Sequence, residues 1–116
     1  MTKVTDTTIE LTRGDSLLVR VSISRNGEIY TPEQGDTIMF YLKHQTMNMK
    51  RSAYIDEEPV ISKDVPIDTM MLTLYPQDTK ELSFGEYVYD LEITFANGFV
   101  DTFINNGRFV LLPEVG

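Results

Sequence analysis

The residues capable of covalent or acid–base chemistry are few and widely separated. The chain of 116 residues contains no Cys and a single histidine, His44. A serine triad needs its histidine between a nucleophilic serine and a carboxylate, and the sequence has no Gly-x-Ser-x-Gly elbow. His44 falls at the end of a predicted strand, where a lone histidine is usually a surface or edge residue. We therefore predict no catalytic residues and expect that the protein is not an enzyme.

The carboxylates also lack the spacing of a catalytic pair. Residues 56–58 are three adjacent carboxylates, whose side chains point to opposite faces of an extended segment and do not converge. Neither an EF-hand nor a His-Glu-x-x-His pattern is present, and the seven glycines are scattered without forming a phosphate-binding loop. Asp36, Asp64 and Asp68 could meet at one end of a β-sandwich to hold calcium, which the sequence leaves open. We expect no metal and no cofactor.

Charge excludes one class of partner. The net charge is −8 at pH 7, and residues 52–116 hold twelve acidic and three basic side chains. Binding to nucleic acid needs clustered Lys and Arg, so we expect no nucleic-acid partner. No apolar run approaches the roughly 20 residues that span a bilayer, so no membrane association is expected. Residues 1–10 are polar and resemble no signal peptide, which predicts synthesis in the cytoplasm.

Residues 11–19 contain Arg13-Gly14-Asp15, the tripeptide of the integrin-recognition signal. An integrin ligand requires a protruding loop in an exported protein. Here Gly14 and Asp15 directly precede a long run of alternating apolar and polar residues, which indicates a tight turn that begins a strand. We therefore expect no integrin binding, and we expect the Arg13 side chain to face water.

Strand signals dominate the rest of the chain. Alternating or β-prone runs predict strands at residues 7–12, 16–24, 37–44, 60–65, 70–75, 85–96, 99–105 and 108–112. The pairs Asn97-Gly98 and Asn106-Gly107 are typical of turns, and Asn106-Gly107 is expected to end one strand before the next begins. Pro76 favours one short helical turn near 76–82. The chain is therefore predicted to be all-β, with seven to nine short strands in one domain over residues 1–116.

Two features favour an immunoglobulin-like antiparallel β-sandwich over a small barrel. Tyr87, with Leu82 beneath it, fits the corner tyrosine of such sandwiches, whose hydroxyl bonds to the backbone a few residues upstream. A strong hairpin over residues 85–105 is the other. The predicted core side chains are Phe40, Tyr89, Leu91, Ile93, Phe103 and Phe109. Met47 and Met49 lie in a poorly patterned segment and could form an apolar interface if they are exposed.

A family resemblance follows from these motifs. Residues 72–115 resemble the C-terminal half of small phage and prophage structural domains, which are similar to the immunoglobulin-like N-terminal domain of phage baseplate upper proteins. The turn Arg13-Gly14-Asp15 before a long strand resembles their N-terminal half. The matching positions of the C-terminal half are Asp78, Thr79, Leu82, Gly85, Tyr87, Tyr89, Asp90, Leu91, Gly98, Thr102 and Gly107.

The resemblance implies a non-enzymatic structural and assembly module of a phage or prophage tail, incorporated into the virion. Its partners would be other tail or baseplate proteins, or further copies of itself. Because the chain ends at Gly116 without a trimerising or receptor-binding extension, we expect an adaptor or connector role. The alternative is an immunoglobulin-like adhesion or carbohydrate-binding module, in which Tyr30, Tyr41 and Tyr54 would stack against sugar rings.

Overall fold

The computed structural model describes residues 2–5, 8–44 and 58–114. Strands make up 59% of the structure, which confirms the expectation of a β-rich chain with almost no helix. Within the described residues, no helix has the length and apolar character needed to cross a membrane. The elements are β1 (Thr2–Thr5), β2 (Thr8–Thr12), β3 (Leu17–Arg20), β4 (Ile23–Arg25), β5 (Glu28–Tyr30), β6 (Thr37–His44), β7 (Ile61–Val65), β8 (Met71–Leu74), α1 (Pro76–Thr79), β9 (Gly85–Thr94) and β10 (Val100–Leu112).

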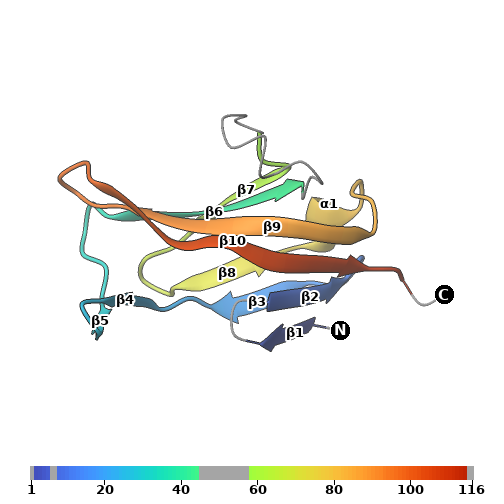
Figure 1. The fold of residues 1–116 in the computed structure, drawn as a ribbon, viewed down its shortest axis with the longest axis horizontal. Helices are drawn as coiled ribbons and strands as arrows, with labels where there is room; N and C mark the ends of the chain where they lie inside the picture. Colours follow the sequence, from blue (N-terminus) through green and yellow to red (C-terminus); the bar gives the residue numbers. More distant parts are fainter. Residues whose placement is uncertain (1, 6–7, 45–57, 115–116) are drawn as a thin grey trace.

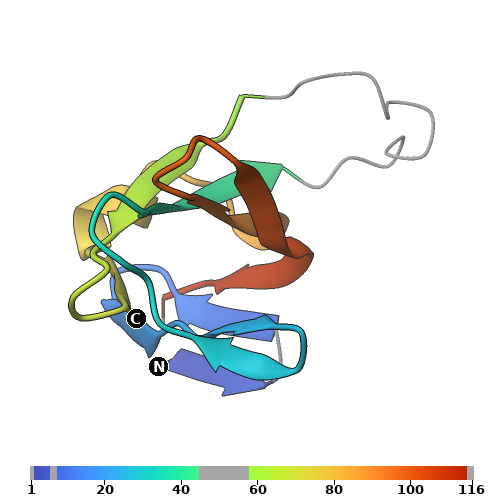
Figure 2. The same ribbon diagram turned by 90° about the vertical axis from the view of Figure 1, so that its left-hand side faces the viewer.

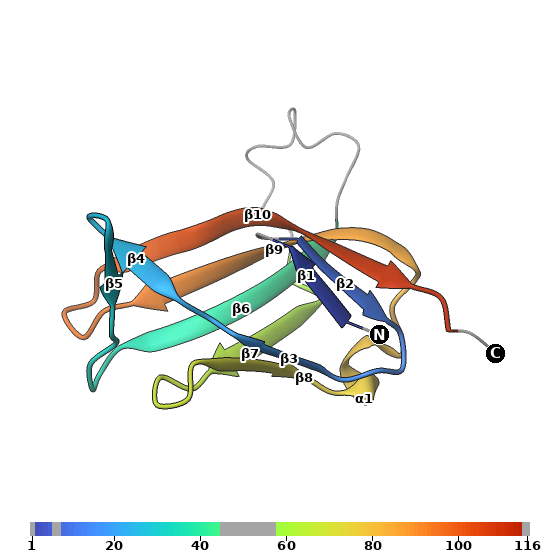
Figure 3. The same ribbon diagram turned by 90° about the horizontal axis from the view of Figure 1, so that it is seen from below.

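Six of these strands form one sheet, in the order β1-β2-β10-β9-β6-β7. All neighbours are antiparallel except β2 and β10, which run parallel. The sheet curls into a half-barrel, and the two-stranded ribbon β3–β8 lies across its open side (Figures 1 and 3). A second ribbon, β4–β5, forms a hairpin at one end of the molecule, and α1 lies at the other end.

The apolar core fills the space between the curled sheet and the β3–β8 ribbon. Strand β6 begins and ends where the sequence pattern predicts, with Ile38, Phe40 and Leu42 fully buried on one face. The Phe40 ring lies 5.5 Å from that of Tyr89 and 6.5 Å from that of Phe109, between ring centroids. Leu17, Leu72 and Leu74 of the ribbon close the core from the opposite side.

The predicted strand over residues 16–24 is divided in two. Residues of β3 pair with β8, whereas residues of β4 pair with β5 across the Asn26-Gly27 turn. Between them, the Val21 amide donates to the Met70 carbonyl oxygen at 2.7 Å. Val21 and Ile23 are nevertheless buried, so the alternation of apolar residues continues while the pairing partner changes. Alternation of apolar residues therefore predicts which side chains of a strand face the core, but it does not predict which strand pairs with it.

The break expected at Asn106-Gly107 was a wrong prediction, because β10 runs through it as one strand of 13 residues. Register shifts against β9 occur between Thr102 and Ile104 and between Ile104 and Gly107. Each shift is a β-bulge, which adds a residue on one strand and increases the local bend. The bulges let one long strand follow the curled sheet. Strand β1, which pairs antiparallel with β2, was not predicted at all.

Candidate functional site

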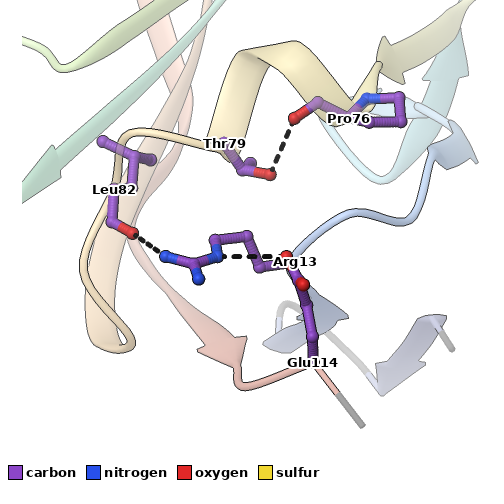
Figure 4. Close-up of polar contacts among 5 residues, drawn as sticks. All are labelled: Arg13, Pro76, Thr79, Leu82 and Glu114. Carbon is purple, nitrogen blue, oxygen red and sulfur yellow. Dashed lines mark hydrogen bonds and ion pairs between the residues drawn. The ribbon is translucent and has the colours of Figure 1, made fainter. Parts of the chain in front are cut away.

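Arg13 of the Arg13-Gly14-Asp15 turn is held on three sides, contrary to the expectation that it faces water. Its Nη1 donates to the Leu82 carbonyl oxygen at 3.2 Å, and its Nε lies 3.4 Å from Glu114 Oε1 (Figure 4). The guanidinium carbon lies 4.2 Å from the centre of the Phe84 ring, a cation–π contact. Arg13 therefore ties the end of β2 to the segment after α1 and to the C-terminal residues.

The backbone of this turn is as constrained as its side chain. The Asp15 amide donates to the Thr12 carbonyl oxygen at 3.0 Å, and Gly14 has a φ of 96°, which disfavours any residue with a Cβ. The Arg13 amide donates to the Leu112 carbonyl oxygen at 2.9 Å and extends the pairing of β2 with β10. The tripeptide thus forms a tight turn against the fold and not a protruding loop.

The predicted corner tyrosine makes a bond of the expected kind. Tyr87 is buried at the start of β9, and its hydroxyl donates to the Ser83 carbonyl oxygen at 2.7 Å. Burial raises the pKa of Tyr87 above its usual value. Leu82, one residue before Ser83, is partly buried against the core. The segment between α1 and β9 is thereby fixed to the sheet that follows it.

The short helix α1 is held in place by contacts of the Asp78 carboxylate. The Asp78 carboxylate accepts a hydrogen bond from the Tyr75 amide at 2.7 Å, which caps the start of the helix. Asp78 also forms an ion pair with Lys63 of β7 at 3.1 Å. Lys63 Nζ lies 5.7 Å from the centre of the Tyr75 ring. These contacts connect α1 to the edge strand of the curled sheet.

The predicted core residues occupy two environments. Phe40, Tyr89, Leu91, Ile93 and Phe109 are buried, and burial raises the pKa of Tyr89. Phe103 is only partly buried, which corrects its placement as a full core residue. It is the extra residue between Thr102 and Ile104, where the register of β10 shifts. A bulged residue no longer follows the in-and-out alternation on which the prediction depended.

Asp36 is the most highly connected carboxylate among the described residues. It is 5% exposed, and its oxygens accept hydrogen bonds from the Tyr30 hydroxyl at 2.6 Å, the Glu33 amide at 2.9 Å and the Ala96 amide at 3.0 Å. The Tyr30 bond and the Glu33 amide lower the pKa of Asp36. The same bond raises the pKa of Tyr30 to about 12. Asp36 therefore joins the loop before β6 to the turn after β9.

A second buried carboxylate secures the bulge in β10. Asp90 is 9% exposed; its Oδ2 lies 2.8 Å from Lys43 Nζ, and its Oδ1 accepts a hydrogen bond from the Asn106 amide at 2.8 Å. Asn106 has a φ of 56°, in the left-handed region that Asn tolerates better than most residues. A Cβ at Gly107 would lie 2.6 Å from the Tyr89 ring. Asn106 thus tolerates the backbone conformation of the bulge, and Gly107 leaves room for the Tyr89 ring beneath it.

The remaining predicted residues have simple placements. The Gly98 amide donates to the Phe95 carbonyl oxygen at 2.8 Å, so Asn97-Gly98 forms the expected turn between β9 and β10. His44 is exposed, with its ring 5.4 Å from that of Tyr87. Met47 and Met49, proposed as an interface, lie outside the described residues, as does Tyr54.

Neither the calcium hypothesis nor the sugar-stacking hypothesis gains support from this geometry. No group of three His, Asp or Glu side chains within the described ranges is placed to hold a metal ion. The Tyr30 hydroxyl bonds to Asp36, and its ring makes an edge contact with Phe95 at 5.6 Å. Tyr30 is thus engaged within the protein, while Tyr41 is only partly exposed on β6.

One apolar cavity opens where β3 leads into β4. It measures about 190 Å³ and is lined mainly by Ile9, Val19, Val21, Leu72, Leu91 and Ile104. Sites for small organic ligands usually measure roughly 300–1,000 Å³ and contain a few converging polar groups. This cavity is smaller than that, so it carries no assignment as a ligand site.

Large apolar side chains on the surface are the feature that the sequence patterns missed. The exposed ones among the described residues are Leu18, Ile29, Tyr75, Phe84, Phe99 and Val100. Tyr75 and Phe84 lie against the cations of Lys63 and Arg13. Phe99 and Val100 follow the turn after β9, and Ile29 lies in β5, a strand of three residues that is too short for alternation to indicate exposure.

Comparisons of the chain with protein-family models, curated proteins and solved structures found no match.

Proposed function

We propose that this chain is a non-enzymatic structural and assembly module of a phage or prophage tail, built as an immunoglobulin-like β-sandwich. Its work would be to bind other tail or baseplate proteins. The observation that carries the proposal is that three buried polar side chains are engaged in holding the fold together. The carboxylates of Asp36 and Asp90 and the hydroxyl of Tyr87 each hold one segment of the backbone against another.

Strand order supports the immunoglobulin-like assignment. In that architecture, the second and fifth main strands pair in one sheet, and the third, sixth and seventh form the other. Here β3 pairs with β8, and β6, β9 and β10 are consecutive neighbours in the curled sheet. The bond from Tyr87 to Ser83 is of the kind that the corner tyrosine of that architecture makes. Under the proposed assignment, the β4–β5 hairpin would be an addition between the second and third main strands.

The resemblance to phage tail domains supports the assembly role. Three of the positions that carry it make structural contacts, because Asp78 caps α1, Tyr87 bonds to Ser83 and Gly107 lies over Tyr89. Such a domain needs a rigid scaffold and outward-facing contact residues. The anchored turns and the exposed Ile29, Phe99 and Val100 fit that need.

The proposal is tested by purifying the chain and measuring its mass by light scattering after gel filtration. The measurement is made on the chain alone and after mixing with each protein encoded on either side of its gene. We expect self-association or a stable complex with at least one neighbouring protein. A monomer that binds none of these proteins would contradict the assembly role.

A further inference from the structure

Three connections meet at one end of the molecule, which we call the loop end. It comprises residues 25–36, 66–70 and 95–101, which include the turn of the β4–β5 hairpin with β5 and the loop to β6, the β7–β8 turn and the β9–β10 turn. Figure 1 shows these turns at the end opposite α1, and Figure 2 looks directly onto them. In immunoglobulin-type domains, loops gathered at one end form the binding surface of variable domains.

Two of the three segments of the loop end, residues 25–36 and 95–101, are held together by contacts between them. Asp36 accepts hydrogen bonds from Tyr30 of β5 and from the Ala96 amide after β9. The Arg25 guanidinium carbon lies 4.5 Å from the centre of the Phe95 ring and 5.3 Å from that of Tyr30. Loops fixed in this way lose little conformational freedom when a partner binds, which favours affinity.

Three large apolar side chains at or beside the turns face solvent. Ile29 is 81% exposed, Phe99 is 72% exposed and Val100 is 59% exposed. An open hollow of about 340 Å³ lies beside Ile29, lined also by Arg25 and Glu28. The exposed rings elsewhere, Tyr75 and Phe84, are each covered by a cation. Exposed apolar side chains on a rigid scaffold are typical of protein interfaces.

The charges around these side chains have one predominant sign. Residues 25–36, 66–70 and 95–101 contain one basic residue, Arg25, and five carboxylates. Four of the carboxylates are exposed, and these are Glu28, Glu33, Asp68 and Asp101. Arg25 is engaged over the rings of Tyr30 and Phe95. The end of the molecule that carries these exposed apolar side chains is therefore predominantly acidic.

We infer that the loop end is the docking surface for a protein partner that presents lysines or arginines around apolar side chains. Complementary charge would guide the encounter, and Phe99, Val100 and Ile29 would be buried on docking. A second copy of the chain does not fit, because two acidic loop ends would face each other. This docking surface presupposes the interaction module proposed above and names the part of it that binds.

The test uses full-length chains that carry matched substitutions. Phe99→Ser with Val100→Ser removes apolar surface at the loop end, and Leu18→Ser makes a similar change on β3, where Leu18 is 64% exposed. Asp101→Lys reverses a charge at the loop end, and Glu81→Lys reverses one near α1. Binding to each purified protein encoded beside the gene is measured by calorimetry, and melting curves establish that every variant folds.

We expect the Phe99/Val100 variant and the Asp101→Lys variant each to weaken binding by about tenfold or more, while both control variants bind like the parent chain. We also expect binding to weaken as sodium chloride rises from about 50 mM to about 500 mM. If a neighbouring protein binds and the loop-end variants bind equally well, the docking surface is wrong but the assembly role stands. If the parent chain neither self-associates nor binds a neighbouring protein, the assembly role fails and the docking surface with it. If the chain only self-associates, or if the Phe99/Val100 variant abolishes self-association, the assembly role stands and the docking surface is wrong.

Discussion

Replacing Tyr87 with Phe removes a single oxygen atom from the corner between α1 and β9. The ring of Tyr87 is 3% exposed and would keep its packing in the variant. What is lost is the hydrogen bond of 2.7 Å from the hydroxyl to the Ser83 carbonyl oxygen. Ser83 is exposed, so water can replace the lost donor and no buried acceptor is left without a partner.

The expected cost follows from that geometry. A neutral hydrogen bond contributes about 0.5–1.5 kcal/mol net to stability, and rehydration of the Ser83 carbonyl keeps the loss within that range. For a domain of this size, about 1 kcal/mol corresponds to a decrease in melting temperature of roughly 4 °C. Tyr87→Phe should therefore fold normally and unfold about 4 °C earlier.

The assay is thermal and urea unfolding of the parent chain and two variants, followed by circular dichroism. Tyr41→Phe is the matched control, since the hydroxyl of Tyr41 makes no hydrogen bond to any residue that the structure describes. It should lower the melting temperature by less than about 1 °C, as most surface changes do. If Tyr87→Phe were as stable as Tyr41→Phe, the corner bond would not stabilise the fold.

Three further predictions concern the other structural junctions. Asp36→Asn should destabilise the chain by about 1.5–3 kcal/mol at pH 7, because the charged carboxylate accepts three hydrogen bonds. Since folding lowers the pKa of Asp36, its contribution to stability is fully present above the unfolded value of about 3.9 and is lost progressively as pH falls from there through the lower folded-state pKa. Urea titrations at pH 7 and pH 3 should therefore give a smaller difference between parent and variant at pH 3; an equal difference would contradict the role of the charge. Gly107→Ala should cost about 1–3 kcal/mol, because its Cβ would collide with the Tyr89 ring, and the loss is read from the urea midpoint. Integrin-bearing cells should not adhere to wells coated with the folded chain, because Arg13 is held by Leu82, and adhesion abolished by Asp15→Glu would refute this.

Local sequence patterns correctly predicted those strands and turns whose formation depends on neighbouring residues in the chain and not on distant contacts. Strand β6 was predicted with its observed limits, since Ile38, Phe40 and Leu42 alternate without interruption and all face the core. The turn at Asn97-Gly98 was predicted because Asn-Gly pairs favour positive φ wherever they occur, and Gly98 has a φ of 93°. In both places the local preference and the tertiary fold agree.

The errors occurred where a distant residue decides the outcome. Asn106-Gly107 has the composition of a turn, but Asp90 and Tyr89 on the neighbouring strand turn it into a bulge. Arg13 was expected to face water, because nothing in residues 11–19 reveals that Leu82 and Glu114 approach it. Contacts separated by many residues leave no periodic signal in the sequence.

The candidate site was even less accessible to sequence patterns. Phe99 follows a turn and Ile29 lies in a strand of only three residues, so periodicity cannot distinguish an exposed apolar residue from a buried one at either position. The carboxylates Glu28, Asp68 and Asp101 are exposed and lie on separate segments. Only the fold brings these segments to one end (Figure 2). The acidic composition was evident from the sequence. The sequence did not reveal that several carboxylates lie at the same end of the molecule as the exposed apolar side chains.

The central claim is that this chain is a structural component of a phage or prophage tail. The most direct test is quantitative mass spectrometry of tail particles, purified by density gradient from a bacterium that carries the gene and has been induced to produce phage. We expect peptides of this chain in a fixed ratio to the other tail proteins through successive rounds of purification. Its absence from particles that contain the neighbouring tail proteins would contradict the claim.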